Sequence, residues 1–490
     1  MQRTLICAEN VTVSFGARTL FHIENLEIRE GDRIGLVGMN GSGKTTLLAL
    51  FCGALKPDEG TLILNCSPAF FHQLSDAAEN CAAAEELSLF GVKELEGSKS
   101  VSGGEGTRLR LAELFSKESP LYLIDEPTSH LDAEGVEYLA QRLWSIETFV
   151  LVSHDRELLD AQCDSIIEIE HGEVKRYEGN YSSYLEQKKR AFERASFEYE
   201  QYSGEMERLT SAYRAKKEQA KIAAKKPRGM SSSEAKVRDF SSMRRSPKGK
   251  AKGLERSAEN IKKRMEHMEV KEKPKELPKI RPLFSLTDPP RNPVIMEAES
   301  LSFTYPNGRE IFRDAVFRLM RGSRTVLLGE NGSGKTTLIR LILEGKLIRT
   351  VPKAKLGYLK QDLSDLDDTL TVLECAAETS VQSPTVVRNI LARLLFTARD
   401  IEKPVSVLSG GERVRLAFAR IYLSDANVLV LDEPTNYLDI PSVEAIQAML
   451  AEYEGTMLFA SHDKTFVRAV ATDALLIENK KIVEYDLSDY

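Results

Sequence analysis

The sequence predicts an α/β protein made of two repeated domains that are joined by a long antiparallel helical hairpin. A Gly-rich loop at 38–46 returns 291 residues later at 329–337, and each copy lies between a short apolar run and a helical pattern. Between the copies, a basic segment carries apolar residues three and four positions apart, as long paired helices do. We therefore expect a first domain at 1–180, a hairpin at 181–290 with its tip at about 225–250, and a second domain at 291–490.

Length and composition bound the class of protein. A chain of 490 residues exceeds what one hydrophobic core supports, and 42% hydrophobic with 29% charged residues is ordinary globular composition. The six cysteines include no C-x-x-C pair, so we expect reduced thiols rather than a zinc site or a disulfide scaffold. No apolar run is long enough for a bilayer, and the chain opens on a strand-like segment rather than a signal peptide. We expect a cytoplasmic protein without a membrane partner.

Each domain should contain a mostly parallel sheet. Apolar runs precede the Gly-rich loops at 33–37 and 325–328, and helical patterns follow them. Other short apolar runs are typical of buried parallel strands, and they extend from Leu121 to Ile124, Phe149 to Val152, Val428 to Leu431 and Met457 to Ala460.

The Gly-rich loops are the candidate phosphate sites, because backbone N–H groups at a helix N-terminus meet the charge of a polyphosphate. Lys44 and Lys335 would reach the β- and γ-phosphates, while the hydroxyls of Thr45 and Thr336 would bind Mg²⁺. The predicted nucleotide ligands here are Gly38, Asn40, Gly41, Ser42, Gly43, Lys44, Thr45 and Thr46, and Gly329, Asn331, Gly332, Ser333, Gly334, Lys335, Thr336 and Thr337.

A carboxylate pair ends one apolar strand of each domain. Asp125 and Asp432 could hold the Mg²⁺ shell, and the following Glu126 and Glu433 could polarise an attacking water. In both copies the Asp lies 23 positions after the Ser of a Ser-Gly-Gly-Glu sequence. A lone Asp-Glu pair is usually a solvated turn, but this repeated spacing favours the catalytic interpretation.

Three further residue pairs recur at matching positions. His154 and His462 each end a strand and are candidate γ-phosphate sensors, the alternative being structural histidines. Gln73 and Gln361 are candidates for Mg²⁺ and water contacts, although glutamine is common on surfaces. Phe15 and Tyr305 could stack on adenine or serve as core aromatics.

Together these motifs resemble the ATP-binding-cassette superfamily over about 390 residues. The resemblance implies that the cassettes meet head to tail, so that each ATP lies between one phosphate loop and the Ser-Gly-Gly-Glu signature of the other cassette. ATP would then hold the halves together, and hydrolysis would release them. The signature residues are Ser102, Gly103, Gly104 and Glu105 in the first cassette and Ser409, Gly410, Gly411 and Glu412 in the second.

The segment between the cassettes is basic. Residues 185–281 contain 28 Lys and Arg against 15 Asp and Glu, a net charge of +13 in a chain whose total is −7. Such density suits a nucleic-acid backbone, although a charge run can also be a solvated linker. The predicted first arm, 181–224, would be about 65 Å long. The two apolar seams of the hairpin are Phe192, Ala195, Tyr199, Tyr202, Met206, Leu209 and Tyr213, and Leu254, Ala258, Ile261, Met265 and Met268.

The chain resembles the ABC-F class in three features: its signatures end in Glu, its two cassettes lack a membrane segment, and a basic linker joins them. The resemblance implies an ATPase with ATP and Mg²⁺ that acts on the ribosome, contacting ribosomal RNA and tRNA, with the linker reaching toward the peptidyl transferase centre. We expect a monomer that protects against ribosome-targeting antibiotics and binds neither DNA nor membrane. The alternatives are a housekeeping translation factor and the ATPase subunit of an exporter.

The two copies also differ. Gln73 and Ser102 are separated by 28 residues, against 47 between Gln361 and Ser409, so the first helical subdomain is short and lacks the extra arm of several housekeeping members. After the Walker B strand the first copy reads Ser-His-Leu-Asp at 129–132, where the family has Asn-His-Leu-Asp. These differences favour an antibiotic-resistance member and two sites of unequal activity.

Overall fold

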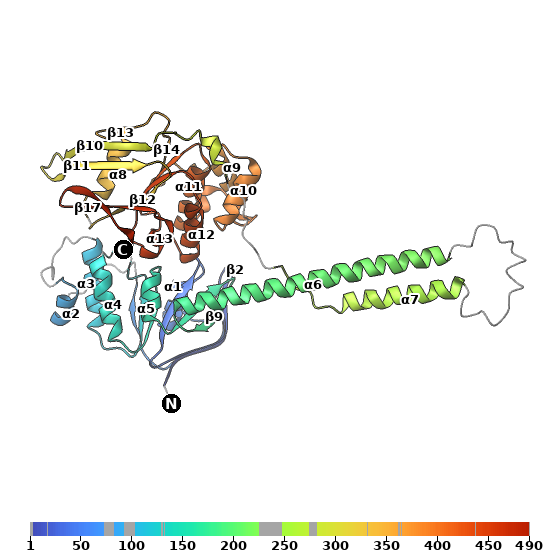
Figure 1. The fold of residues 1–490 in the computed structure, drawn as a ribbon. Coiled ribbons are helices and arrows are strands. Elements are labelled where there is room, and N and C mark those ends of the chain that lie inside the picture. The colour runs from blue at the N-terminus through green and yellow to red at the C-terminus, as the bar shows by residue number, and fades with distance from the viewer. Residues whose placement is uncertain are drawn as a thin grey trace, which may run out of the picture. The chain divides into compact units, whose positions relative to one another are not determined.

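The computed structural model describes residues 3–16, 18–72, 83–92, 103–128, 131, 133–224, 247–273, 282–330, 332–360, 363, 365–436 and 438–489. The chain forms two compact units (Figure 1). Both cassettes belong to one unit, Met1–Tyr184 with Leu277–Tyr490, and the hairpin Leu185–Glu276 is the other. None of the described helices is long and apolar enough to cross a bilayer.

The first cassette is built on a sheet whose nine described strands run in the order β4-β1-β2-β9-β8-β3-β7-β6-β5. Strands β5, β6, β7, β3 and β8 are parallel neighbours. The strands are β1 (Thr4–Phe15), β2 (Arg18–Arg29), β3 (Arg33–Gly38), β4 (Glu59–Leu64), β5 (Ala69–Phe71), β6 (Tyr122–Asp125), β7 (Phe149–Val152), β8 (Ser165–Glu170) and β9 (Glu173–Glu178). The helices are α1 (Lys44–Phe51), α2 (Ala84–Leu89), α3 (Gly103–Phe115), α4 (Ala133–Trp144) and α5 (Arg156–Gln162).

The second cassette repeats this plan with two separate sheets in its described residues, ordered β11-β10-β13 and β14-β15-β16-β12-β17-β18. The strands are β10 (Val294–Thr304), β11 (Glu310–Met320), β12 (Arg324–Leu328), β13 (Arg349–Thr350), β14 (Leu356–Leu359), β15 (Val428–Asp432), β16 (Thr456–Ala460), β17 (Asp473–Glu478) and β18 (Lys481–Tyr485). The helices are α8 (Lys335–Leu343), α9 (Val372–Glu378), α10 (Pro384–Arg393), α11 (Gly410–Leu423), α12 (Ile440–Ala451) and α13 (Lys464–Val470). Short 3₁₀ turns are η4 (Phe284–Thr287), η5 (Asp400–Glu402), η6 (Val405–Val407) and η7 (Leu487–Asp489).

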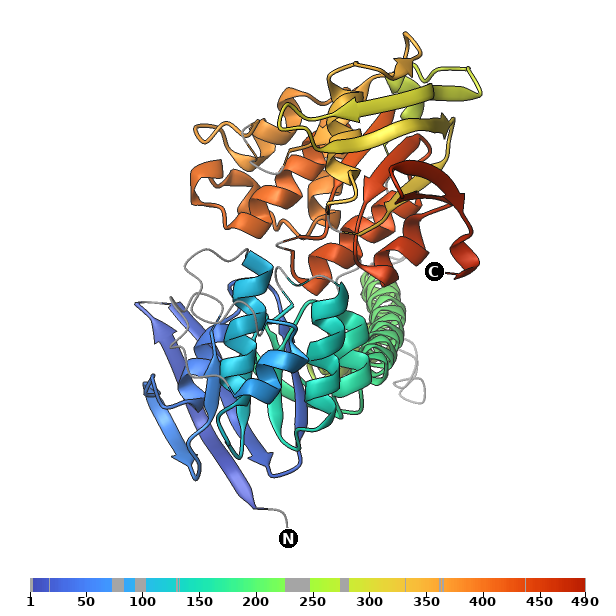
Figure 2. The same ribbon diagram turned by 90° about the vertical axis from the view of Figure 1, so that its left-hand side faces the viewer.

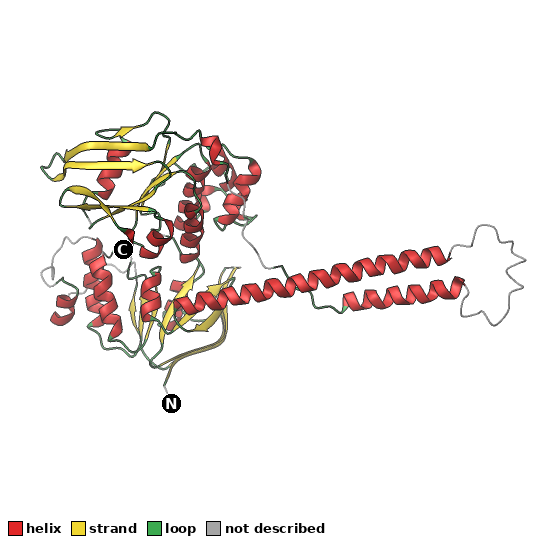
Figure 3. Cartoon of the chain, viewed as in Figure 1, coloured by secondary structure: helices red, strands yellow, loops and turns green. Residues whose placement is uncertain are grey.

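The central strands are buried on both faces, as continuous apolar runs in parallel sheets are. Along β15, Leu429 and Leu431 belong to one apolar cluster, while Val428 and Val430 belong to another on the opposite face. All residues of β6, β7, β15 and β16 are buried, which confirms the strands expected from the apolar runs. Helices of each cassette pack against its strands (Figures 2 and 3).

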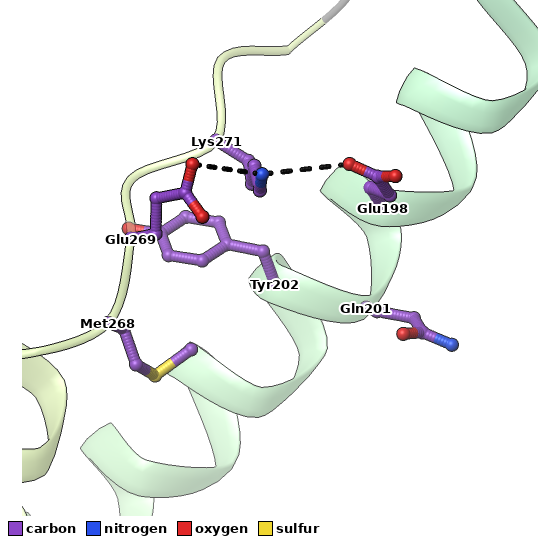
Figure 4. A pocket seen from close by; sticks show the side chains of 6 residues that line it. All are labelled: Glu198, Gln201, Tyr202, Met268, Glu269 and Lys271. Atoms are coloured by element: carbon purple, nitrogen blue, oxygen red, sulfur yellow. Dashed lines mark ion pairs between the residues drawn. The ribbon is translucent and has the colours of Figure 1, made fainter. Parts of the chain in front are cut away.

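The hairpin unit contains most of α6 (Tyr181–Ala224), a helix of 44 residues, and α7 (Pro247–Glu266), a helix of 20 residues. Two ion pairs fix an antiparallel register: Arg264 Nη2 lies 3.0 Å from Glu205, and Lys271 Nζ lies 3.6 Å from Glu198. From the first pair to the second, the residue number falls by seven on α6 and rises by seven on the second arm, so the two arms run antiparallel. Around Lys271, which also pairs with Glu269, the ring of Tyr202 and the thioether of Met268 lie together (Figure 4).

Burial follows the predicted seams over part of their length. Leu209 and Ala258 are buried, and the other seam residues from Tyr199 onward are half-buried. Phe192 and Ala195 are exposed, contrary to the predicted seam. Residues 274–281 lie outside the described residues. Helix α7 begins at Pro247, inside the stretch expected to be the tip, and proline suits a first helical position. Residues 225–246 lie outside the described residues.

Candidate functional site

Each phosphate loop is shaped by a glycine that directly precedes its helix. Gly43, before α1, has φ 104°, and Gly334, before α8, has φ 120°. A Cβ at Gly43 would meet Leu20 at 2.8 Å, and one at Gly334 would meet Ile311 at 2.5 Å. Both the backbone conformation and the close approach of β2 or β11 therefore require glycine here.

A buried lysine lies at the centre of each loop. Lys44 Nζ donates to the carbonyls of Gly38 at 2.8 Å and Met39 at 3.2 Å. Lys335 Nζ makes the equivalent bonds to Gly329 and Glu330, at 2.7 and 3.2 Å. Burial lowers the pKa of both ammonium groups, and nearby carboxylates oppose this shift. Each lysine is thus a positive charge held by neutral carbonyls.

The loops fit a bound polyphosphate. Ser42 Oγ and Ser333 Oγ are buried and have no hydrogen-bond partner among the described residues. A Cβ added at Gly41 would meet nothing within 4 Å, so the space next to this part of the first loop is open. An orphaned hydroxyl beside a buried lysine and a helix N-terminus matches the acceptor oxygens of a phosphate.

Mg²⁺ fits the neighbouring oxygen atoms. Thr45 Oγ1 donates to Asp125 Oδ2 at 2.7 Å, and the Thr336 hydroxyl bonds to Asp432. Asp432 Oδ2 is buried and lacks a hydrogen-bond partner among the described residues. The described residues contain no group of three or more His, Cys, Asp or Glu that could bind a metal. One hydroxyl and one carboxylate suit Mg²⁺, which takes its remaining ligands from phosphates and water.

The predicted Glu and His pairs come together because their strands are neighbours. Glu126 follows β6 and His154 follows β7, and these strands pair in parallel, as do β15 and β16 in the second cassette. His154 Nε2 lies 3.0 Å from Glu126 Oε1. His462 Nε2 lies 3.4 Å from Glu433 Oε1, and its backbone N–H donates to Glu433 Oε2 at 3.3 Å.

Both glutamates have left-handed backbone conformations, with φ 51° at Glu126 and φ 50° at Glu433. This region is unfavourable for a residue with a Cβ, and the N–H bonds to Val152 and Ala460, each 3.0 Å long, hold it in place. Burial, with the charge of Asp432 second, raises the pKa of Glu433 to about 7, against the opposing effect of Lys335. Such a carboxyl can exchange a proton near neutral pH.

The predicted adenine contacts differ between the cassettes. Phe15 is 62% exposed. Tyr305 is half-buried, shares a 3.0 Å hydrogen bond between its hydroxyl and Thr337 Oγ1, and lies under the guanidinium of Arg340. Both aromatic side chains line the cavity that the phosphate loops line.

The second signature forms a capped helix start. The Ser409 backbone N–H donates to Glu412 Oε2 at 2.9 Å, and the Glu412 N–H donates to Ser409 Oγ at 3.4 Å, which makes a capping box. In the first cassette α3 begins at Gly103, with Gly104 and Glu105 in its first turn. Four predicted site residues lie outside the described residues, namely Gln73, Ser102, Asn331 and Gln361.

One cavity is lined by both phosphate loops, by Glu126 and Glu433, and by Gly410 and Gly411 of the second signature. A residue absent from the predicted site contacts the first phosphate loop. Asp439 accepts the backbone N–H of Asn40 in the first phosphate loop at 2.5 Å, and it caps α12 through Ser442 N at 3.0 Å. The Asp-Ile-Pro sequence predicts the cap, but the contact with the other cassette depends on the tertiary fold.

Two phosphate loops, each with an Asp-Glu pair and a histidine at adjacent strand ends, define a protein with two ATP-binding cassettes. The ABC transporter family matches residues 21–89 and 312–436. The chain is 32% identical to ribosome protection protein VmlR of Bacillus subtilis (strain 168), covering 99% of this chain and 89% of VmlR. It is 36% identical to erythromycin resistance ATP-binding protein MsrA of Staphylococcus epidermidis, covering 92% and 93%.

Among solved structures, the RNase-L Inhibitor has a TM-score of 0.62 at 18% identity, covering 96% of this chain and 87% of that one. This likeness confirms the tandem-cassette fold. With the sequence relatives, it shows that the chain belongs to the ABC-F family of ATP-binding-cassette ATPases. Its reaction is therefore the hydrolysis of ATP.

Proposed function

We propose that the protein binds the ribosome in its ATP-bound form, extends the hairpin toward the peptidyl transferase centre and protects against ribosome-targeting antibiotics. Hydrolysis of ATP releases it. The observation that carries the proposal is the combination of a cavity shared by both phosphate loops with a hairpin of net charge +13 over residues 185–281. The names of VmlR and MsrA, a ribosome protection protein and an erythromycin resistance protein, support it.

At each site we assign the phosphates to the Gly-rich loop and its lysine. Thr45 with Asp125, and Thr336 with Asp432, would hold Mg²⁺, which would neutralise charge on the phosphates. Glu126 and Glu433 orient the attacking water and take its proton, and the adjacent histidines sense the γ-phosphate. The second signature, which lines the cavity, completes the first site from the opposite cassette.

The hairpin is proposed to contact ribosomal RNA and tRNA through phosphate groups. The stretch 214–252 contains 14 basic and 3 acidic residues. Contacts of this kind release counterions, so the affinity should fall steeply with salt. Lys221 on α6 and Lys252 on α7 are exposed on the described arms and are suitable probes.

Co-sedimentation with ribosomes tests the partner. A Glu126→Gln, Glu433→Gln double variant should bind ATP without turning it over and should pellet with ribosomes only when ATP is present. Lys221→Gln with Lys252→Gln should lower the slope of log affinity against log salt by about 2. The matched control, Lys346→Gln with Lys353→Gln on exposed lysines of the second cassette, should leave the slope unchanged. Absence of ATP-dependent co-sedimentation would contradict ribosome binding.

Expression in a sensitive bacterium tests protection. Resistance should rise for at least one class among macrolides, lincosamides, streptogramins, pleuromutilins and phenicols, and the double Glu→Gln variant should not confer it. Ribosome binding without any resistance would instead favour a housekeeping translation factor. Recovery in the membrane fraction with a partner subunit, and no ribosome binding, would favour an exporter subunit.

A further inference from the structure

The first turn of α6 is anchored in the first cassette. Tyr181 and Tyr184 are buried, and the Tyr184 hydroxyl donates to Glu168 Oε1 on β8 at 2.6 Å. Asp160, on α5, accepts the backbone N–H of Ser182 at 2.6 Å. The start of this long helix is therefore held by β8 and by α5 together.

Helix α5 joins that anchor to the first ATP site. It begins at Arg156, two residues after His154, and Asp155 caps it by accepting the N–H of Leu158 at 3.0 Å. Asp160 lies one turn further along the same seven-residue helix. A shift of the strand end that carries His154 would therefore move Asp160, which accepts an N–H in the first turn of α6.

Arg156 also reaches the second cassette. Its Nη1 lies 3.3 Å from Gln447 Oε1 and 4.0 Å from Glu444 Oε1, both on α12. The Arg156 side chain is 9% exposed, and its Nε and Nη2 are buried without a hydrogen-bond partner among the described residues. A guanidinium is always charged, and its fork matches a carboxylate bidentately. The carboxylate of Glu444, at 4.0 Å, is at the outer limit of such a pair.

Helix α12 connects this pair to both the phosphate loop and the start of α6. Its cap, Asp439, accepts the Asn40 N–H in the first loop. Ile440 packs in the same apolar cluster as Tyr181 and Tyr184, and the Tyr181 hydroxyl donates to the Glu444 carboxylate. Glu444 thus faces Arg156 and the first turn of α6 at once.

We propose that Arg156 is a positioning residue that couples ATP binding at the first site to the start of the linker helix. When ATP draws the cassettes together, Glu444 closes a bidentate pair with Arg156. This pair fixes α12, keeps Asp439 on the first phosphate loop and holds Tyr181 through Glu444. The inference rests on the proposed two-cassette ATP site.

The second cassette supplies a matched control. Lys464 is the counterpart of Arg156, because each residue follows a His-Asp pair. The control itself is another basic residue of the same helix. Further along α13, Arg468 forms an ion pair with Glu157 of the first cassette at 3.3 Å, but these side chains are 59% and 46% exposed. An exposed pair of this kind is weak, so Arg468→Gln should leave the coupling intact.

Amide hydrogen exchange of residues 182–190 tests the coupling. The parent protein is the full chain with Glu126→Gln and Glu433→Gln, which retains ATP. ATP should slow exchange in this parent. Adding Arg156→Gln or Glu444→Gln should reduce that protection about two- to thirtyfold, and the two changes together should have no further effect. Arg156→Lys should restore part of the protection.

The outcomes separate the two ideas. Failure of the parent to bind ATP in an equilibrium titration would contradict the proposed site. ATP binding without slower exchange in the parent, or protection that survives both Arg156→Gln and Glu444→Gln, would overturn the coupling alone. A loss in Arg468→Gln as large as that in Arg156→Gln would also overturn it.

Discussion

The two cassettes carry the same phosphate loop but hold their glutamates differently. In the first, His154 lies 3.0 Å from Glu126 and is 29% exposed. In the second, the separation between His462 and Glu433 is 3.4 Å and the histidine is 50% exposed. The first histidine is therefore the more confined of the two, so identical motifs do not imply identical sites.

The surroundings of the two sites differ as well. The start of α6 is joined to the first site through α5, because Asp160 on α5 accepts the backbone N–H of Ser182. Tyr305, the candidate adenine contact of the second site, is hydrogen-bonded to Thr337 on α8, whereas Phe15, the candidate of the first site, is exposed. We infer that the first site is coupled to the linker and the second is the more self-contained.

The largest effect should come from the glutamates. The double variant Glu126→Gln, Glu433→Gln should lower kcat about 10²- to 10³-fold, because it removes both general bases. Of the single variants, Glu126→Gln should be the more damaging, since the histidine beside it is closer and less exposed. Steady-state ATPase assays at saturating Mg-ATP measure this, with the exposed Glu173→Gln as control. Equal losses in the single variants would break the comparison.

The pH dependence of the free energy of unfolding should reveal the environment of Glu433. Its folded pKa of about 7 lies above the ordinary 4.5, so its protonated form favours folding below about pH 4.5 and that contribution is lost as pH rises through 7. Without nucleotide and metal, the unchanged protein should lose stability between pH 5 and pH 8 as Glu433 ionises. Glu433→Gln should lose about 2 kcal/mol less over the same range. Urea unfolding at both pH values measures it. A pH-independent difference between parent and variant would contradict the raised pKa.

Asp439→Ala should cost about 1.5 kcal/mol of unfolding free energy, because α12 loses its cap. It should also weaken ATP binding at the first site, since the Asn40 N–H loses its acceptor. Thr371→Ala removes the cap of α9, which does not line the cavity, and is the control for stability alone. Urea unfolding and ATP titration report the two effects. Unchanged ATP affinity in Asp439→Ala would show that the Asn40 contact does not act on the nucleotide.

The smallest effect should come from the aromatic pair. Tyr305→Phe removes the hydrogen bond to Thr337 and should cost about 1 kcal/mol of unfolding free energy. Phe15→Tyr adds a hydroxyl at an exposed position and should be neutral within about 0.5 kcal/mol. Urea unfolding of both variants measures the two changes in unfolding free energy. Equal changes would remove this difference between the cassettes.

Much of the fold follows from local pattern. Continuous apolar runs predict the buried parallel strands, and the Gly-Lys-Thr sequence after such a run predicts a loop before a helix. Asp125 meets Thr45 because β6, which Asp125 ends, and β3, which leads into the phosphate loop, lie on either side of β7 in one parallel sheet. These are properties of short segments and of their repetition.

The sequence does not reveal what depends on register between distant segments. Arg156 and Gln447 are 291 residues apart, and no local pattern pairs them. Phe192 and Ala195 continue the predicted seam but are exposed, because periodicity indicates an apolar face and does not show what covers it. The unequal Glu to His distances likewise arise from tertiary packing around equal motifs.

The left-handed backbone at Glu126 and Glu433 lowers the stability of the protein at the two residues proposed to be needed for activity. Each Cβ in that conformation costs about 1–2 kcal/mol, which glycine would recover. A laboratory selection for heat resistance alone should therefore enrich glycine at these two positions and yield sturdier but inactive proteins. A thermostable form that still hydrolyses ATP would have to gain its stability elsewhere in the chain.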